Sequence, residues 1–118
     1  MSKRSAELFI EDILFSLEKI ESYTKNMTAK KFYDDFKTID AVVRNLSIIG
    51  EASSNIPKEM KLKYPEVPWV EIIGMRNKVV HEYFGVDEEI LWKTIKEDLP
   101  VFRKQIQNIK RRQKSLGL

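Results

Sequence analysis

Apolar side chains recur at three- and four-residue spacing along most of the chain, and this period constrains the fold more than any other feature of the sequence. Such spacing places apolar residues on one side of an α-helix. A first helix is predicted over about residues 3–25, with Ser2 or Ser5 placed to cap its start. Its apolar positions are Leu8, Ile13, Leu14, Leu17 and Ile20. Because no stretch alternates apolar and polar residues between turn residues, we expect no β-strand.

A second, long helix is predicted to begin after Thr28, whose hydroxyl suits the N-cap position, and to continue until shortly before Pro57. Its apolar stripe comprises Phe32, Phe36, Ile39, Val43, Leu46, Ile49 and Ala52. The segment 56–68 holds three prolines and should be mostly loop, with room for one helical turn at 58–63.

A third helix is predicted from Pro68 or Trp69, because proline suits the first helical turn, up to Gly85, because glycine commonly follows a helix end. Asp87 then caps a fourth helix, which is kinked at Pro100 and extends into the basic end of the chain. Its apolar positions are Ile90, Leu91, Ile95, Leu99, Phe102, Ile106 and Ile109. The pattern as a whole predicts an all-α fold, an up-and-down four-helix bundle with a proline-containing loop before the third helix.

The length of 118 residues suits one domain, which we expect to span residues 1–118. The chain has no cysteine and one histidine, which excludes disulfides, thiolate metal sites, cysteine nucleophiles and multi-histidine metal centres. We therefore expect no metal and no cofactor. No apolar run approaches the ~18 residues of a membrane span, and the amino-terminal sequence includes acidic residues where a signal peptide needs an unbroken apolar stretch. We expect a soluble cytoplasmic protein.

The net charge of +3 is unevenly distributed. Residues 99–118 carry six cations and no acidic residue, so the rest of the chain has a net charge of −3. A basic helix end at about 103–118 predicts attraction to phosphate or to an acidic partner. The alternative is a solvated helix end whose cations complement the helix dipole, and composition does not separate the two.

The sequence RNKVVHEY at 76–83 gathers the groups best suited to catalysis. In a continuous helix, Arg76 and Tyr83 lie almost on one line and Asn77 and His81 on a neighbouring line, so one polar strip carries all four. His81 would then lie in the last helical turn, whose negative end favours a protonated imidazole. Arg76 and His81 would be about 140° apart around the axis, so a second copy of the helix could complete the site.

The same region resembles a known family. The sequences WVEIIGMRN at 69–77, HEYFGVD at 81–87 and LW at 91–92 are similar to the signature of the HepT-like family in the HEPN superfamily. The sequences IEDIL at 10–14, TIDAVVRNL at 38–46 and IGEA at 49–52 agree with the same pattern, so the resemblance covers residues 8–103.

The resemblance implies a small all-helical homodimer that cleaves RNA as the toxin of a toxin-antitoxin pair. It also implies a partner, a minimal nucleotidyltransferase antitoxin (MntA), which inactivates the toxin by attaching AMP to the motif tyrosine. Arg76 and His81 match the motif's arginine and histidine, and Tyr83 matches its tyrosine. A bulky anionic AMP group at Tyr83 would compete with the RNA phosphate.

The residue types fit such chemistry independently. Metal-free RNA cleavage requires a proton acceptor or donor that works near neutral pH and a fixed cation for the charge that develops on phosphorus. His81 can act as general base or acid, and Arg76 can hold the phosphate through its planar fork. The expected products are a 2′,3′-cyclic phosphate and a 5′-hydroxyl. Asn77 either orients His81 or satisfies a polar position at the dimer interface.

Asp40, Arg44 and Glu51 lie on or beside the apolar stripe of the second predicted helix. One interpretation is an exposed i,i+4 ion pair of Asp40 with Arg44, worth roughly 0.3–0.5 kcal/mol. The other, which we prefer, places all three at a dimer cleft near the motif. Asp12 admits the same two interpretations.

Two alternatives to a ribonuclease remain open. The first is a non-catalytic HEPN binding module that dimerises and holds a nucleotide or the nucleotidyltransferase, with Arg76 only binding phosphate. The second is a structural bundle with a basic, RNA-attracting end. The presence of both Arg76 and His81 favours an enzyme over the structural bundle but does not separate it from the binding module.

Overall fold

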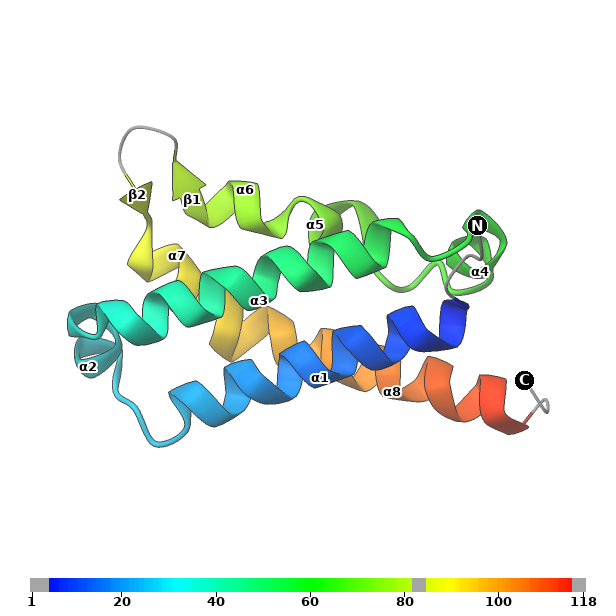
Figure 1. Cartoon of the computed structure of the whole chain (residues 1–118), viewed down its shortest axis with the longest axis horizontal. Helices are drawn as coiled ribbons and strands as arrows, with labels where there is room; N and C mark the ends of the chain where they lie inside the picture. Colours follow the sequence, from blue (N-terminus) through cyan, green and yellow to red (C-terminus); the bar gives the residue numbers. More distant parts are fainter. Residues whose placement is uncertain (1–4, 82–84, 116–118) are drawn as a thin grey trace.

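The computed structural model describes residues 5–81 and 85–115 and is a bundle of helices measuring 45 × 30 × 27 Å (Figure 1). This confirms the predicted all-α class. Helix α1 (Ala6–Thr24) is capped by Ser5, one of the two expected caps, whose hydroxyl accepts a hydrogen bond from the Leu8 backbone N–H at 3.3 Å. In Figure 1, α3 crosses the middle of the molecule, with α5 and α6 above it and α1 and α8 below.

The second predicted helix is divided into α2 (Ala29–Asp34) and α3 (Phe36–Ser54). Thr28 caps α2 as predicted. The prediction of one uninterrupted helix is wrong, because Asp35 caps a second helix, α3. The Asp35 carboxylate accepts hydrogen bonds from the backbone N–H and the hydroxyl of Thr38, at 3.0 and 2.8 Å. These bonds hold the pKa of Asp35 below its ordinary value. Phe36, predicted in the apolar stripe, is instead 71% exposed.

The proline-containing segment holds one short helix, α4 (Lys58–Lys63), at the position where the sequence allowed a helical turn. Residues 64–68 form no helix, yet Tyr64 and Val67 are buried in the core. The indole N–H of Trp69 donates to the carbonyl oxygen of Tyr64 at 3.1 Å, which ties this segment to the start of the next helix.

The third predicted helix starts at the expected place but ends early. It consists of α5 (Trp69–Ile73) and α6 (Met75–Val79), interrupted by a turn at Gly74. Strand β1 (Val80–His81) follows and pairs antiparallel with β2 (Gly85–Val86). The predictions of a helix up to Gly85 and of no β-strand are therefore wrong.

The backbone leaves the helix at Val80, which is extended, with φ −110° and ψ 120°. Two consecutive β-branched residues, Val79 and Val80, favour this change because their side chains are restricted in a helix and fit a strand well. Gly85 has φ +78°, a backbone conformation that glycine adopts without steric cost. The backbone N–H of Asp87 donates to the Val79 carbonyl at 2.7 Å and closes the two-stranded ribbon.

The fourth predicted helix is a chain of three segments: α7 (Glu88–Lys93), the π-helical η1 (Thr94–Asp98) and α8 (Leu99–Ser115). Asp87 caps α7 as predicted, accepting from the Ile90 N–H at 3.0 Å. Pro100 has no N–H for the helical bond to the Lys96 carbonyl, and the π-helical turn lies directly before it. Figure 1 shows that α7 and α8 run in different directions.

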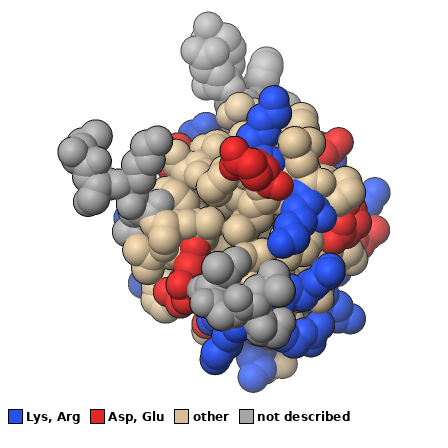
Figure 2. Space-filling view, turned by 90° about the vertical axis from the view of Figure 1, so that its right-hand side faces the viewer, with Lys and Arg blue, Asp and Glu red and all other residues tan. Residues whose placement is uncertain are grey.

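The core is formed by the facing sides of α1, α3, α5 and α8 and includes residues from every predicted helix. It extends into the basic end of the chain, where Ile106 and Ile109 are fully buried. Figure 2 looks onto the end of the bundle where α8 finishes and shows Lys and Arg gathered along its lower margin. Among the described residues, no helix is both long and apolar enough to cross a membrane.

Candidate functional site

Helix α6 carries exposed polar residues between two buried apolar residues. Met75 and Val79, its first and last residues, are 5% and 0% exposed and anchor it in the core. Arg76, Asn77 and Lys78 lie between them and are all exposed. The guanidinium of Arg76 is thus available to a ligand, while the backbone that carries it is fixed by its two apolar neighbours.

His81 lies outside the helix. The last helical bond in this region is donated by the Val80 N–H to the Arg76 carbonyl, and His81 follows in β1, where it is paired with Gly85. Its predicted place in the last helical turn is wrong, and with it the argument that the helix dipole favours its protonated form. The prediction that one helical strip carries all four polar groups of the motif is also wrong, because the helix ends at Val79. Tyr83 and the side chain of His81 lie outside the described part of the chain.

The segment that carries Arg76 and His81 is held from two directions. On one side, α5 packs directly on α3, because a β-carbon on Gly50 would lie 2.9 Å from the Ile73 carbonyl oxygen. On the other, the ribbon joins α7 through the Asp87 hydrogen bond to Val79. The only sequence sign of the first contact is an isolated glycine in a helical pattern.

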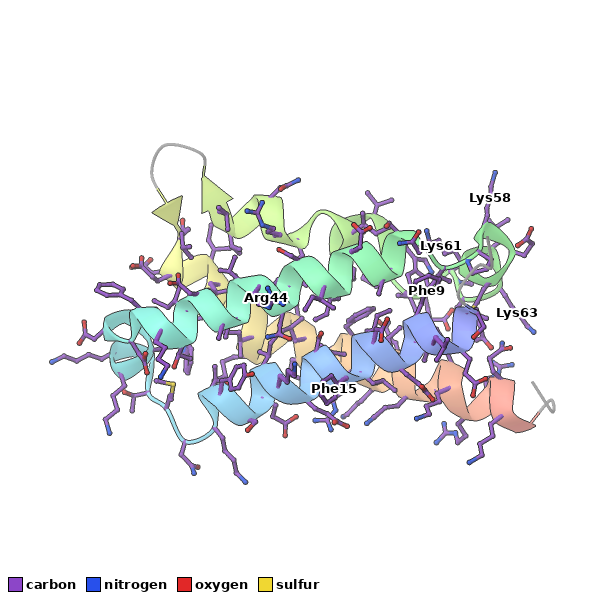
Figure 3. The ribbon with its side chains drawn as sticks, in the orientation of Figure 1. Phe9, Phe15, Arg44, Lys58, Lys61 and Lys63 are labelled. Atoms are coloured by element: carbon purple, nitrogen blue, oxygen red, sulfur yellow. The ribbon has the colours of Figure 1, made fainter. Side chains whose placement is uncertain are left out.

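The other predicted site residues lie along α3 and α1. Asp40, Arg44 and Glu51 are exposed, and within the described residues Asp40 and Arg44 form no ion pair with each other. Arg44 and Glu51 line a hollow of about 530 Å³ together with Asp12 of α1, whereas Asp40 does not line it. Figure 3 shows Arg44 midway along α3. The structure therefore brings Arg44, Glu51 and Asp12 together.

Two further observations concern ligands. Among residues 5–81 and 85–115, no group of three His, Cys, Asp or Glu side chains is arranged to hold a metal ion. A second polar region lies between α1 and the η1–α8 segment and includes Lys25, Lys96, Arg103 and Lys104, of which the last two belong to the basic end noted in the sequence. These residues come from segments about 70 positions apart, so only the folded chain brings them together.

A helical bundle with an exposed arginine five residues before its one histidine has the features of a candidate metal-free nuclease. Comparison with known proteins assigns the family. Residues 13–109 match the family described as "Ribonuclease HepT-like". The chain belongs to the HepT-like ribonuclease family.

Three relatives are similar to the chain along almost their entire length. The chain is 46% identical to a Thermococcus cleftensis protein named "Probable ribonuclease HepT", over 92% of this chain and 99% of the relative. It is 42% identical to "Putative RNase MJ1380" of Methanocaldococcus jannaschii, over 91% and 98% of the two chains. It is also 42% identical to "Putative RNase TTE0752" of Caldanaerobacter subterraneus, over 90% and 95%. No solved structure matches the chain at a significant level.

Proposed function

We propose that this protein is a metal-independent endoribonuclease that acts as the toxin of a toxin-antitoxin pair in the cytoplasm, with Arg76 and His81 as its catalytic residues. One observation carries the proposal. In a member of the HepT-like family, an exposed Arg76 stands on a short helix anchored in the core, five residues before the one histidine of the chain. A fixed cation and an imidazole are the two groups that metal-free RNA cleavage requires.

In the proposed reaction, the ribose 2′-oxygen attacks the adjacent phosphorus and the bond from phosphorus to the 5′-oxygen breaks. The 2′-hydroxyl proton passes to the general base, and the departing 5′-oxygen takes a proton from the general acid. The products are a 2′,3′-cyclic phosphate and a 5′-hydroxyl, so no co-reactant is consumed. Arg76 binds the non-bridging phosphate oxygens, where negative charge increases in the transition state.

We place the complete site at the interface of a homodimer. Two histidines, one His81 from each protomer, then supply the general base and the general acid. Exposed apolar residues beside the motif support this arrangement, since Val70 on α5 is 81% exposed and Ile73 is 37% exposed. A partner protomer packed on α5 would cover both. In this dimer, Asn77 supports His81, and Asp40, Arg44 and Glu51 line the cleft between protomers.

Control of the toxin is proposed to act on Tyr83. A nucleotidyltransferase antitoxin of the MntA type transfers AMP from ATP to the phenolic oxygen, and pyrophosphate leaves. Tyr83 is two residues from His81 in sequence, so the added phosphate lies close to the catalytic groups. Its charge and bulk then exclude the RNA phosphate from Arg76.

Induced expression tests the function and the shared site together. The wild-type protein should arrest growth, whereas His81→Ala and Arg76→Ala, each soluble and folded, should not. Mixing the two inactive variants tests whether the site is shared, because partial activity of the heterodimer requires its one remaining Arg76 and its one remaining His81, which lie on different chains, to act together. Full toxicity of a soluble His81→Ala protein would remove His81 from the mechanism, and a folded dimer that holds RNA without cutting it would favour a binding module.

A further inference from the structure

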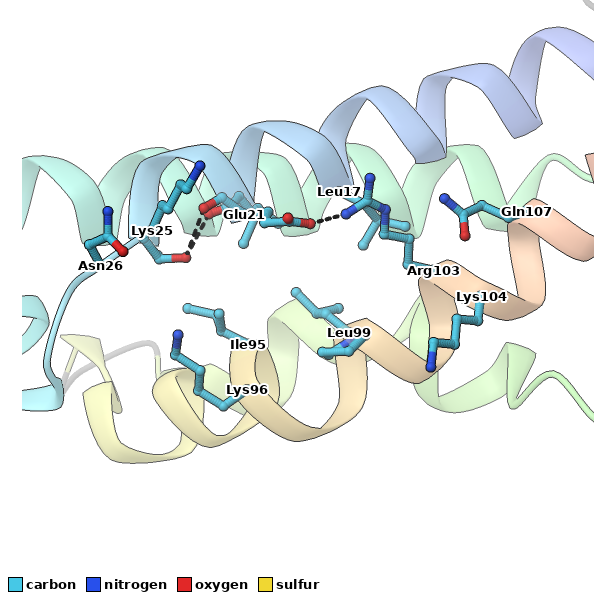
Figure 4. Close-up of a pocket in the computed structure, with 13 residues that line it drawn as sticks. Leu17, Glu21, Lys25, Asn26, Ile95, Lys96, Leu99, Arg103, Lys104 and Gln107 are labelled. Carbon is cyan, nitrogen blue, oxygen red and sulfur yellow. Dashed lines mark hydrogen bonds and ion pairs between the residues drawn. The ribbon is translucent and has the colours of Figure 1, made fainter.

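A basic groove lies between α1 and the η1–α8 segment, away from the motif helix (Figure 4). Its main hollow measures about 520 Å³. The floor is apolar, formed by Leu17, Ile20, Ile95, Leu99 and Pro100. Four cations line it, namely Lys25, Lys96, Arg103 and Lys104. Among the described residues lining this hollow, Glu21 is the one carboxylate, and it forms an ion pair with Arg103.

The groove continues along α8. A second hollow, of about 510 Å³, shares Gln107 with the first and is lined by Lys110, Arg111 and Lys114 of α8. It contains one carboxylate, that of Glu18 on α1. From Lys96 to Lys114 the cations extend over about 27 Å of helix, at roughly 1.5 Å per residue. This length suits an extended polyanion with several successive charges better than a small anion.

The opposite side of α8 has the opposite charge. A hollow of about 570 Å³ between α5–α6 and η1–α8 is lined by four carboxylates, those of Glu66, Glu71, Glu97 and Asp98, and by one cation, Lys78. The two hollows are similar in size but opposite in charge: the residues lining the hollow beside α1 have a net charge of +3, and those lining the hollow beside α5–α6 have a net charge of −3. A polyanion that approaches α8 is attracted to the α1 side and repelled from the other.

We propose that the α1–α8 groove binds the sugar-phosphate backbone of single-stranded RNA at a distance from the point of cleavage. The ammonium and guanidinium groups contact successive phosphates, and the apolar floor receives the faces of bases or riboses. The inference rests on the proposed ribonuclease function and adds an anchoring site to it. The groove then sets the affinity for long RNA, while the motif residues set the rate of the chemical step.

Substitutions test the groove better than deletions, because removing the basic end would also remove the buried Ile106 and Ile109. The test variant is Lys25→Gln/Lys104→Gln/Lys110→Gln, which neutralises three exposed cations from both hollows and keeps the ion pair of Arg103. The matched control is Lys30→Gln/Lys31→Gln/Lys37→Gln, which removes the same charge from exposed positions on α2 and α3. Thermal unfolding confirms that both are folded.

Two measurements separate anchoring from chemistry. The first is the Kd for a single-stranded 2′-O-methyl RNA of about 20 nucleotides, which cannot be cleaved by 2′-hydroxyl attack, over a range of salt concentrations. The groove variant should bind at least about tenfold more weakly at 0.1 M salt, and its log–log salt slope should fall by about 2 units, as expected for three lost phosphate contacts on a single strand. The second is kcat/KM for a dinucleotide substrate, which both variants should leave within about twofold of wild type.

Equal weakening of RNA binding by both variants, or unchanged binding by the groove variant, would overturn the proposal. So would a groove variant that binds RNA normally but no longer binds the nucleotidyltransferase, since the groove would then belong to an acidic protein surface. Absence of dinucleotide cleavage by the wild type would reject the proposed ribonuclease activity instead. The Kd comparison still decides the groove in that case.

Discussion

Gly50 and Ile73 are in backbone contact: a β-carbon on Gly50 would lie 2.9 Å from the Ile73 carbonyl oxygen. This close approach lets α5 lie directly on α3. Because α6 follows α5 after a single turn residue, Gly74, the contact also sets the position of Arg76. One glycine therefore links the packing of the bundle to the geometry of the candidate site.

Gly50→Ala should destabilise the protein by about 1–3 kcal/mol, because the added methyl group forces two backbones apart. The sign is informative, since Gly→Ala inside a helix ordinarily stabilises by about 1 kcal/mol. Gly74→Ala is the matched control, as its β-carbon would lie 3.5 Å from the Val70 carbonyl, an ordinary contact. It should leave stability unchanged or raise it by up to about 1 kcal/mol. Denaturant unfolding of the two variants measures both effects, and a stabilising Gly50→Ala would disprove the close contact.

The Asp35 cap should give α3 a pH-dependent stability. Its pKa is lowered in the folded protein by the hydrogen bonds from Thr38, so its contribution is present above the ordinary aspartate pKa, near 4. The contribution is lost as the pH falls through the lowered folded pKa. The difference in unfolding free energy between wild type and Asp35→Ala should therefore shrink as the pH falls below about 4.

Thr28→Ala provides the comparison, because the Thr28 hydroxyl also caps a helix but does not titrate in this range. It should cost about 1 kcal/mol at every pH at which the protein is folded. Parallel pH profiles for the two variants would show that the Asp35 carboxylate has the same pKa folded and unfolded.

Arg76 should matter through its shape as well as its charge. Arg76→Ala should lower kcat for a dinucleotide about 10²- to 10³-fold, the size of effect seen when one transition-state contact is lost. Arg76→Lys should recover only part of this loss, because lysine keeps the charge without the planar fork. Since Arg76 is exposed, neither change should alter the unfolding temperature. If both variants kept the kcat of the wild type, Arg76 would have no role in the chemical step.

Tyr83→Phe should separate toxicity from its control. The variant lacks the hydroxyl that we propose accepts AMP, so it should remain toxic when a nucleotidyltransferase antitoxin is expressed with it. Mass spectrometry should find the AMP adduct on the wild-type chain and not on the variant. If the antitoxin still abolished the toxicity of Tyr83→Phe, and AMP were found on another residue, Tyr83 would not be the modified residue.

The sequence predicts a helix start best where a capping residue or a proline stands at the beginning of a new apolar period. The caps at Ser5, Thr28 and Asp87 and the helix start at Trp69 all follow from residue type and spacing. The break at Asp35 does not, because the apolar period continues through it and its capping bond depends on Thr38. Here a local hydrogen bond outweighs the periodic pattern.

The backbone of the motif segment differs from the one that the sequence predicts. Residues 76–83 have spacing that suits a helix and predicts a polar strip, yet Val80 and His81 form a strand. The bond from Asp87 to Val79 that closes the ribbon joins positions that no local pattern pairs. Most cations of the basic groove belong to the basic end that the sequence indicates, but the groove itself is not predictable from it, since Lys25 and part of the apolar floor come from α1 and reach these cations only by the packing of α1 against α8.

The most direct test of the central claim is cleavage of a labelled, structured RNA in excess EDTA by wild-type protein and by His81→Ala, with analysis of the fragment ends. Mass spectrometry should first establish that the wild-type chain carries no AMP. The account predicts fragments with 2′,3′-cyclic phosphate ends from the wild type and none from His81→Ala. Equal cleavage by both proteins, or no cleavage by the unmodified wild type, would contradict it.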